Sequence, residues 1–137
     1  MVTLSREIHA GVLAADTPED SAELRELGLP RIDLVCVDLY PLQKTIEVHG
    51  LSRAHVIEQT DVGGIALLHA GAKGRRIVIA HPADRNTVVA WLRSGRPNTD
   101  EFITELVVRA EAVVADYCLT SARYHSGGRY DGVVVSS

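Results

Sequence analysis

Residues 59–74, with the sequence QTDVGGIALLHAGAKG, decide how the rest of the chain is interpreted. The two glycines after Asp61 permit a tight turn and leave free N–H groups at the start of a helix. Such a helix start favours anions and developing negative charge. Because the segment lies between two hydrophobic strand candidates, we expect it to form the loop and helix of an α/β ligand site.

The strand candidates are residues 32–37 (IDLVCV) and residues 76–81 (RIVIAH). Both are apolar at successive positions and rich in β-branched residues, a pattern typical of strands buried on both faces. Pro41 and Pro82 follow them and prevent further pairing. Strands that alternate with helices predict a parallel sheet with helices on its faces.

Helices are expected at several places along the chain. Thr17 and Pro18 form a strong N-terminal signal for a helix that Gly28 closes. Further helices are predicted at 52–59, at 64–72, from 82 to about 95, and at 99–124, where apolar residues recur at helical spacing. Residues 8–14 are an apolar segment of uncertain type, and residues 130–135 are a candidate last strand.

Length and composition indicate the class of protein. The 137 residues suffice for one domain with its own core, and a net charge of -4 argues against a nucleic-acid or anionic-membrane surface. We find neither an apolar run of the roughly 20 residues that span a bilayer nor a signal-peptide pattern, so a cytoplasmic protein is expected. Cys36 and Cys118 lie far apart in apolar segments, and we expect both to be reduced core residues.

The predicted topology brings several side chains to one edge of the sheet. Tyr40 and His81 follow the two strand candidates, and Asp61 precedes the helix between them. Ligands of open parallel sheets bind beyond the carboxyl ends of the strands. We therefore expect a small-molecule site at that edge.

Four blocks of sequence also carry a family resemblance. They are IDLVCVDLYP at 32–41, TDVGG at 60–64, AGAK at 70–73 and IVIAHPAD at 77–84. In this order and spacing they resemble the IMP cyclohydrolase domain, which is joined to an AICAR formyltransferase in bifunctional purine-biosynthesis proteins. The resemblance covers nearly the whole chain. It implies a shortened methylglyoxal-synthase-like three-layer α/β fold, with a mostly parallel sheet flanked by helices, and a homodimer.

The resemblance also implies catalytic roles. In the family reaction a carboxamide nitrogen attacks a formamide carbon, a pyrimidine ring closes and water leaves. By this resemblance Asp61 would assist the attacking nitrogen, Lys73 would stabilise the oxyanion, and Tyr40 would orient a group or relay a proton. The amides of Gly63 and Gly64 would add hydrogen-bond donors.

Three further residues are candidates for substrate binding. Thr3 matches a family threonine, Asp38 stands where the family has asparagine, and His69 lies one helical turn before Lys73. Val2 occupies the position of a family lysine, and the family's phosphate loops precede the segment that aligns with the N-terminus here. The expected substrate is therefore a purine-pathway intermediate, a ribotide among the options, or a related small molecule. Neither a metal nor another cofactor is expected.

Structural explanations exist for the same residues. Asp61 could cap a helix, Lys73 could be a solvated cation at a helix end, and Tyr40 could pack at the edge of the core. Three functions follow from these alternatives. The first is a cyclohydrolase-like enzyme that closes a ring by dehydration, or opens it as a hydrolase acting on cyclic amidines. The others are a non-catalytic ligand-binding module and a half-domain that needs a partner chain.

Overall fold

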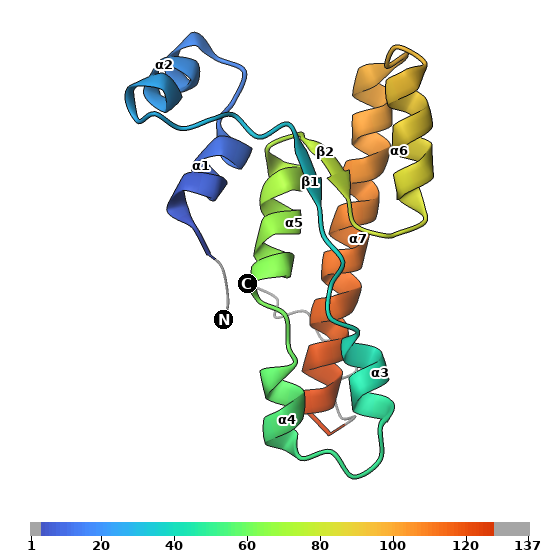
Figure 1. Ribbon diagram of the computed structural model, residues 1–137. Helices are drawn as coiled ribbons and strands as arrows, with labels where there is room; N and C mark the ends of the chain where they lie inside the picture. The colour runs from blue at the N-terminus through green and yellow to red at the C-terminus, as the bar shows by residue number, and fades with distance from the viewer. Residues whose placement is uncertain (1–3, 128–137) are drawn as a thin grey trace, which may run out of the picture.

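The computed structural model describes residues 4–127 (Figure 1). The elements, in chain order, are α1 (Arg6–Leu13), α2 (Pro18–Glu26), β1 (Leu34–Cys36), α3 (Leu42–Glu47), α4 (Arg53–Glu58), α5 (Gly63–Lys73), β2 (Ile77–Ile79), α6 (Asp84–Arg93) and α7 (Thr99–His125). The candidate strand at 130–135 and Thr3 lie outside the described residues.

The sheet of the described chain is parallel, as predicted. β1 and β2 pair in parallel, with Leu34 opposite Ile77, Val35 opposite Val78, and Cys36 opposite Ile79. The chain passes from β1 to β2 through α3, α4 and α5, so the predicted strand, helix and strand of an α/β unit are all present. The long helix predicted at 99–124 is α7.

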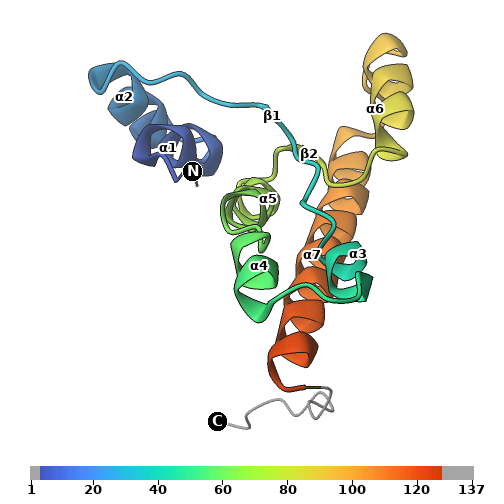
Figure 2. The same ribbon diagram turned by 60° about the horizontal axis from the view of Figure 1, so that its bottom comes forward.

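Helices cover both faces of this sheet (Figures 1 and 2). On one face, Val35 packs with Val12 of α1 and Ala70 of α5, and Val78 packs with Leu68 of α5. On the other face, Ile77 and Ile79 pack with Val88 and Trp91 of α6 and with Leu106 of α7. The α/β fold with helices on either side of a parallel sheet is therefore confirmed.

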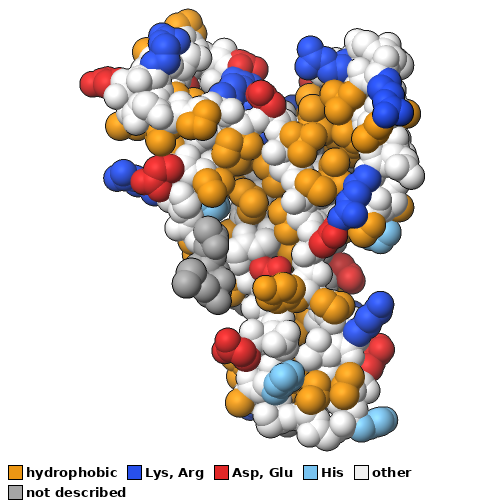
Figure 3. Space-filling view, viewed as in Figure 1, with side chains coloured by type: hydrophobic (Ala, Val, Ile, Leu, Met, Phe, Trp, Pro, Cys, Tyr) orange, Lys and Arg blue, Asp and Glu red, His pale blue; other side chains and the backbone are white. Residues whose placement is uncertain are grey.

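The first strand differs from the prediction that it is buried on both faces. Val35 is buried, but Leu34 is 41% exposed and Cys36 is exposed. On the face to which these two side chains belong, the buried residues of α6 and α7 pack on β2 and leave β1 uncovered. Figure 3 shows hydrophobic side chains in the hollow between the part that carries α1 and α2 and the part that carries α6 and α7.

The expectation that both cysteines are core residues was wrong: Cys36 and Cys118 are free and exposed.

Most of the uncertain segment at 8–14 belongs to the helix α1. The Ser5 side chain caps α1 by accepting a hydrogen bond from the Ile8 N–H at 3.2 Å.

The short helix α3 was not predicted. It has six residues, of which only Leu42 is buried, so it presents no apolar periodicity that the sequence could reveal.

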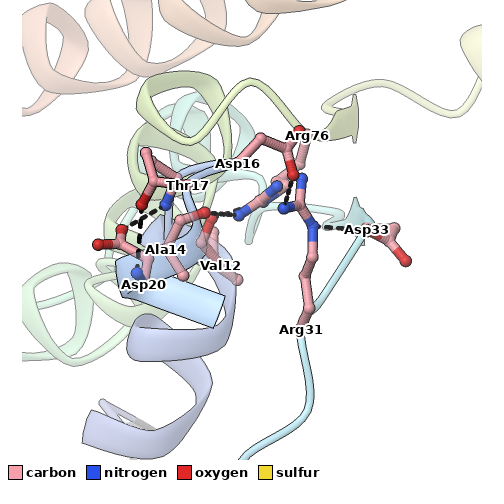
Figure 4. A network of polar contacts seen from close by, with 9 residues as sticks. Val12, Ala14, Asp16, Thr17, Asp20, Arg31, Asp33 and Arg76 are labelled. Carbon is pink, nitrogen blue, oxygen red and sulfur yellow. Dashed lines mark hydrogen bonds and ion pairs between the residues drawn. The ribbon is translucent and has the colours of Figure 1, made fainter. Parts of the chain in front are cut away.

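A buried arginine fastens α1 to the sheet (Figure 4). Arg76, 3% exposed, lies just before β2 and donates from Nε to the Val12 carbonyl at 2.6 Å and from Nη2 to the Ala14 carbonyl. These carbonyls belong to the C-terminal end of α1, where a cation is favoured. Burial, and secondarily the nearby Arg31, lower the pKa of Arg76, which still keeps its charge at neutral pH.

Close backbone packing accompanies this contact. A Cβ atom added at Gly74 would lie 2.2 Å from the Val12 carbonyl oxygen, and one added at Gly11 would lie 2.5 Å from the Pro30 carbonyl oxygen. Both contacts are with backbone, which cannot move aside as a flexible side chain can. The C-terminal half of α1 is therefore held directly against the end of α5 and the segment that leads into β1.

We expect Arg76→Met to lower the free energy of unfolding by about 2 kcal/mol, because the carbonyls of Val12 and Ala14 lose a charged donor in a buried place. Urea denaturation followed by circular dichroism measures this loss. Arg93→Met, on the exposed surface of α6, is the matched control and should change stability by less than about 0.5 kcal/mol. Equal stability of the two variants would contradict the role given to Arg76.

Candidate functional site

A cavity of about 470 Å³ lies beside the start of α5. Its walls come from α1, from the chain after β1, from the end of α4 and the loop that follows, and from the first turns of α5. Tyr40, Asp61, Gly63 and Gly64 all line it. The structure thus brings together four of the residues that the sequence singled out, from two segments some twenty positions apart.

Asp61 is held by hydrogen bonds on both of its sides. Its Oδ1 accepts from the Gly64 N–H at 2.7 Å, and its Oδ2 accepts from the Tyr40 N–H at a longer 3.4 Å. Its own N–H donates to the Tyr117 hydroxyl oxygen at 2.7 Å. Asp61 therefore caps the start of α5, as the structural explanation proposed, while the same carboxylate lines the cavity.

The two glycines have different roles. A Cβ atom added at Gly64 would lie 2.7 Å and 2.9 Å from the two carboxylate oxygens of Asp61, so a side chain at this position would displace the carboxylate. The Gly64 N–H is already donated to Asp61 and is not free for a ligand. The N–H of Gly63, at the first position of α5, makes no hydrogen bond within residues 4–127 and is available as a donor.

Three other predicted residues lie away from the cavity. Asp38 forms an ion pair with Arg85 of α6, and His69 lies on the exposed side of α5, with its Nδ1 3.0 Å from the Glu111 carboxylate. Lys73 is exposed at the far end of α5, an unbroken helix of 11 residues. At 1.5 Å per residue, about 15 Å separates the two ends of this helix, so Lys73 does not meet Asp61 within one chain.

Sequence reasoning missed several residues of the site. The lining also includes Ser5, which caps α1, His9 of α1 and Glu58 of α4. Tyr117 of α7 holds the Asp61 backbone. Burial raises the pKa of the Tyr117 hydroxyl, which therefore stays protonated at neutral pH. The sequence did contain a signal for Tyr117: a tyrosine among the apolar positions of a helix indicates a buried hydroxyl, which needs a polar partner.

The charges around the cavity limit what it can bind. Two acids, Asp61 and Glu58, line it, and none of the described lining residues is lysine or arginine. Such a lining suits a ligand that presents N–H donors, and it offers no side-chain cation to a phosphate. Within residues 4–127, no cluster of three His, Cys, Asp or Glu side chains forms a metal site, and none of the helices is sufficiently long and apolar to span a membrane.

Comparison with known proteins places this geometry in a family. The bifunctional purine biosynthesis protein PurH of Chloroflexus aurantiacus is 42% identical over 125 residues, which are 89% of this chain and 24% of that protein. PurH of Staphylococcus haemolyticus is 39% identical over 118 residues, 84% of this chain and 24% of that protein. The chain thus spans about a quarter of the length of these relatives. No protein-family profile matches it.

A solved structure extends the likeness to the fold. The crystal structure of ForH superposes with a TM-score of 0.78 at 31% identity, over 93% of this chain and 67% of that one. The sequence blocks, the parallel α/β fold and the relatives agree with one another. The chain belongs to the family of the IMP cyclohydrolase domain of PurH, with its methylglyoxal-synthase-like fold.

Proposed function

We propose that this protein catalyses dehydrative ring closure, in which an amide nitrogen attacks a formyl carbon and water leaves. The observation that carries the proposal is the place of Asp61. Its carboxylate lies in a cavity at the start of a helix, and the Tyr40 backbone is bound to it. Membership of the PurH family supports this reaction class.

The reaction needs an oriented nucleophile. A carboxylate can accept several hydrogen bonds, and Asp61 uses only two backbone donors, one of them at 3.4 Å. A carboxamide N–H donated to the remaining lone pairs of Oδ2 would fix the nitrogen and increase its electron density. The carboxylate thereby favours the charge that develops on nitrogen as the new C–N bond forms.

The formyl oxygen needs donors as it becomes negative. The Gly63 N–H at the start of α5 is unpaired within the described residues, and the positive end of the helix dipole lies there. The Tyr40 side chain is 58% exposed and borders the same cavity, so its hydroxyl can reach a bound ligand. These two groups form the oxyanion site that we assign to this chain.

The substrate is a small molecule with adjacent carboxamide and formamide groups, from the purine pathway or a related pathway in the cytoplasm. The cavity itself is suited to the reacting ring, because N–H donors of the ligand face Asp61 and Glu58. A ribotide would place its phosphate outside this lining. The binding residues Thr3, Asp38 and His69 remain predictions for the parts of the substrate that extend beyond the cavity.

The first test is ring closure of the formylated imidazole carboxamide ribotide, followed by absorbance. Asp61→Asn keeps a side-chain oxygen for the Gly64 N–H but removes the negative charge. We expect kcat/KM to fall by at least about 100-fold, the usual cost of losing a charged group that acts on the nucleophile.

Asp20→Asn is the matched control for that experiment. Asp20, in the first turn of α2 and outside the cavity lining, accepts the Ala15 N–H at 2.7 Å. Its substitution therefore tests the loss of a carboxylate that also holds a backbone N–H. It should keep wild-type turnover. Undiminished turnover in Asp61→Asn would contradict the proposed role. A folded wild-type protein that binds the ribotide without turning it over would favour the non-catalytic ligand-binding function.

Lys73 fits the same proposal through a homodimer. Its ammonium group makes no hydrogen bond or ion pair within the part of the chain that is described, and it lies about 15 Å along α5 from the cavity of its own chain. A second copy related by a two-fold axis can bring its Lys73 to the oxyanion site. We therefore propose that Lys73 acts in the cavity of the partner chain.

Mixed dimers test this arrangement. Asp61→Asn and Lys73→Ala are each expected to be nearly inactive alone. After the two variants are mixed, unfolded and refolded together, half of the dimers contain one chain of each kind, and one of their two sites is intact. Activity should then return to about a quarter of wild type. Mixtures that stay inactive would show that Lys73 does not act across the dimer.

A further inference from the structure

His9 lies in the cavity, although neither the sequence patterns nor the family blocks gave it a role. It is carried by α1, which packs against α5, and it lines the same cavity as Tyr40 and Asp61. Its side chain is partly buried, so it is neither a surface residue nor a residue of the apolar core. α1 is held in this place by the buried Arg76.

The hydrogen bond of the imidazole fixes its tautomer. His9 Nδ1 lies 2.9 Å from the Ser5 carbonyl oxygen. A carbonyl oxygen can only accept, so Nδ1 must carry the proton, and in the neutral ring Nε2 is then a bare acceptor. Residues 4–127 provide no hydrogen-bond partner for Nε2. A half-buried histidine with one nitrogen anchored and the other free is arranged as a proton carrier.

The proposed reaction needs such a carrier. Ring closure forms a C–N bond between the carboxamide nitrogen and the formyl carbon, and it later breaks the bond between that carbon and oxygen. One proton leaves the carboxamide nitrogen, one leaves the formamide nitrogen, and both depart with the formyl oxygen as water. No net proton is consumed, because both protons that leave nitrogen end on the departing oxygen. A group that accepts a proton from nitrogen, donates it to oxygen and returns to its starting state can serve the two transfers in turn.

We propose that His9 is this group: its Nε2 receives the proton of the attacking carboxamide nitrogen and delivers it to the leaving oxygen. The proposal rests on the ring-closing function. Asp61 is suited to orientation rather than to carrying the proton away, because both of its oxygens already accept backbone N–H groups. Imidazole can both accept and donate a proton near neutral pH, and the ring is regenerated after each turnover.

The kinetic test compares variants that separate anchoring from proton transfer. His9→Asn can keep a donor for the Ser5 carbonyl, but it has no counterpart of Nε2. We expect kcat to fall by about 100-fold or more while KM changes by only a few-fold. In His9→Ala, imidazole added to the buffer should restore part of kcat, which it would not do for a residue that only packs. His49→Asn, an exposed histidine, is the control.

A second measurement does not depend on turnover. In protein labelled with ¹⁵N-histidine, the His9 ring should show a protonated Nδ1 and a bare Nε2, and aminoimidazole carboxamide ribotide should shift the Nε2 signal through a new hydrogen bond. If the wild-type protein lacks turnover but this shift occurs, the ring-closing function fails while the contact of His9 with the carboxamide stands. An unshifted Nε2 signal, or His9→Asn with wild-type kcat, overturns the proposal for His9.

Discussion

The hydrogen bonds of Asp61 are the interaction on which the site depends. Through the Tyr40 N–H its carboxylate holds the chain that follows β1, and through the Gly64 N–H it fixes the start of α5. Through Tyr117 its backbone is tied to α7. Three parts of the chain that are distant in sequence therefore meet at one residue. The capping role does not compete with the proposed catalytic role, because the cap is what holds the carboxylate at the cavity.

A second constraint acts at the N-terminal end of β2, where Arg76 lies. A buried guanidinium is costly unless its donors are satisfied, and Arg76 satisfies them with carbonyls at the end of α1. This contact couples β2 to the helix that carries Ser5 and His9. The wall of the cavity formed by α1 is thus positioned by the core of the protein rather than by residues of the site.

The sequence was informative where a local pattern determines the outcome. The two strands, the helix start at Asp61 and the meeting of Tyr40 with Asp61 follow from parallel topology, in which strand ends share one edge. The family resemblance predicted that Lys73 acts beside Asp61, but an unbroken helix separates the two residues within one chain. His9 could not be found, because α1 is positioned by Arg76, 64 residues after Val12. The exposure of Leu34 could not be predicted from the sequence either, because the apolar pattern of a strand does not show which helices cover it.

The long helix α7 has a consequence for the order in which the protein becomes functional during synthesis. Its Leu106 and Ala110 complete the cores on the two faces of the sheet, and its Tyr117 holds Asp61. A nascent chain that has reached β2 has both strands and α5, but it lacks the helix that covers them. The Asp61 backbone therefore cannot be held in place until the residues of α7 have left the ribosome. Folding of this domain therefore waits for α7, and intermediates that lack it expose apolar surface that chaperones can bind.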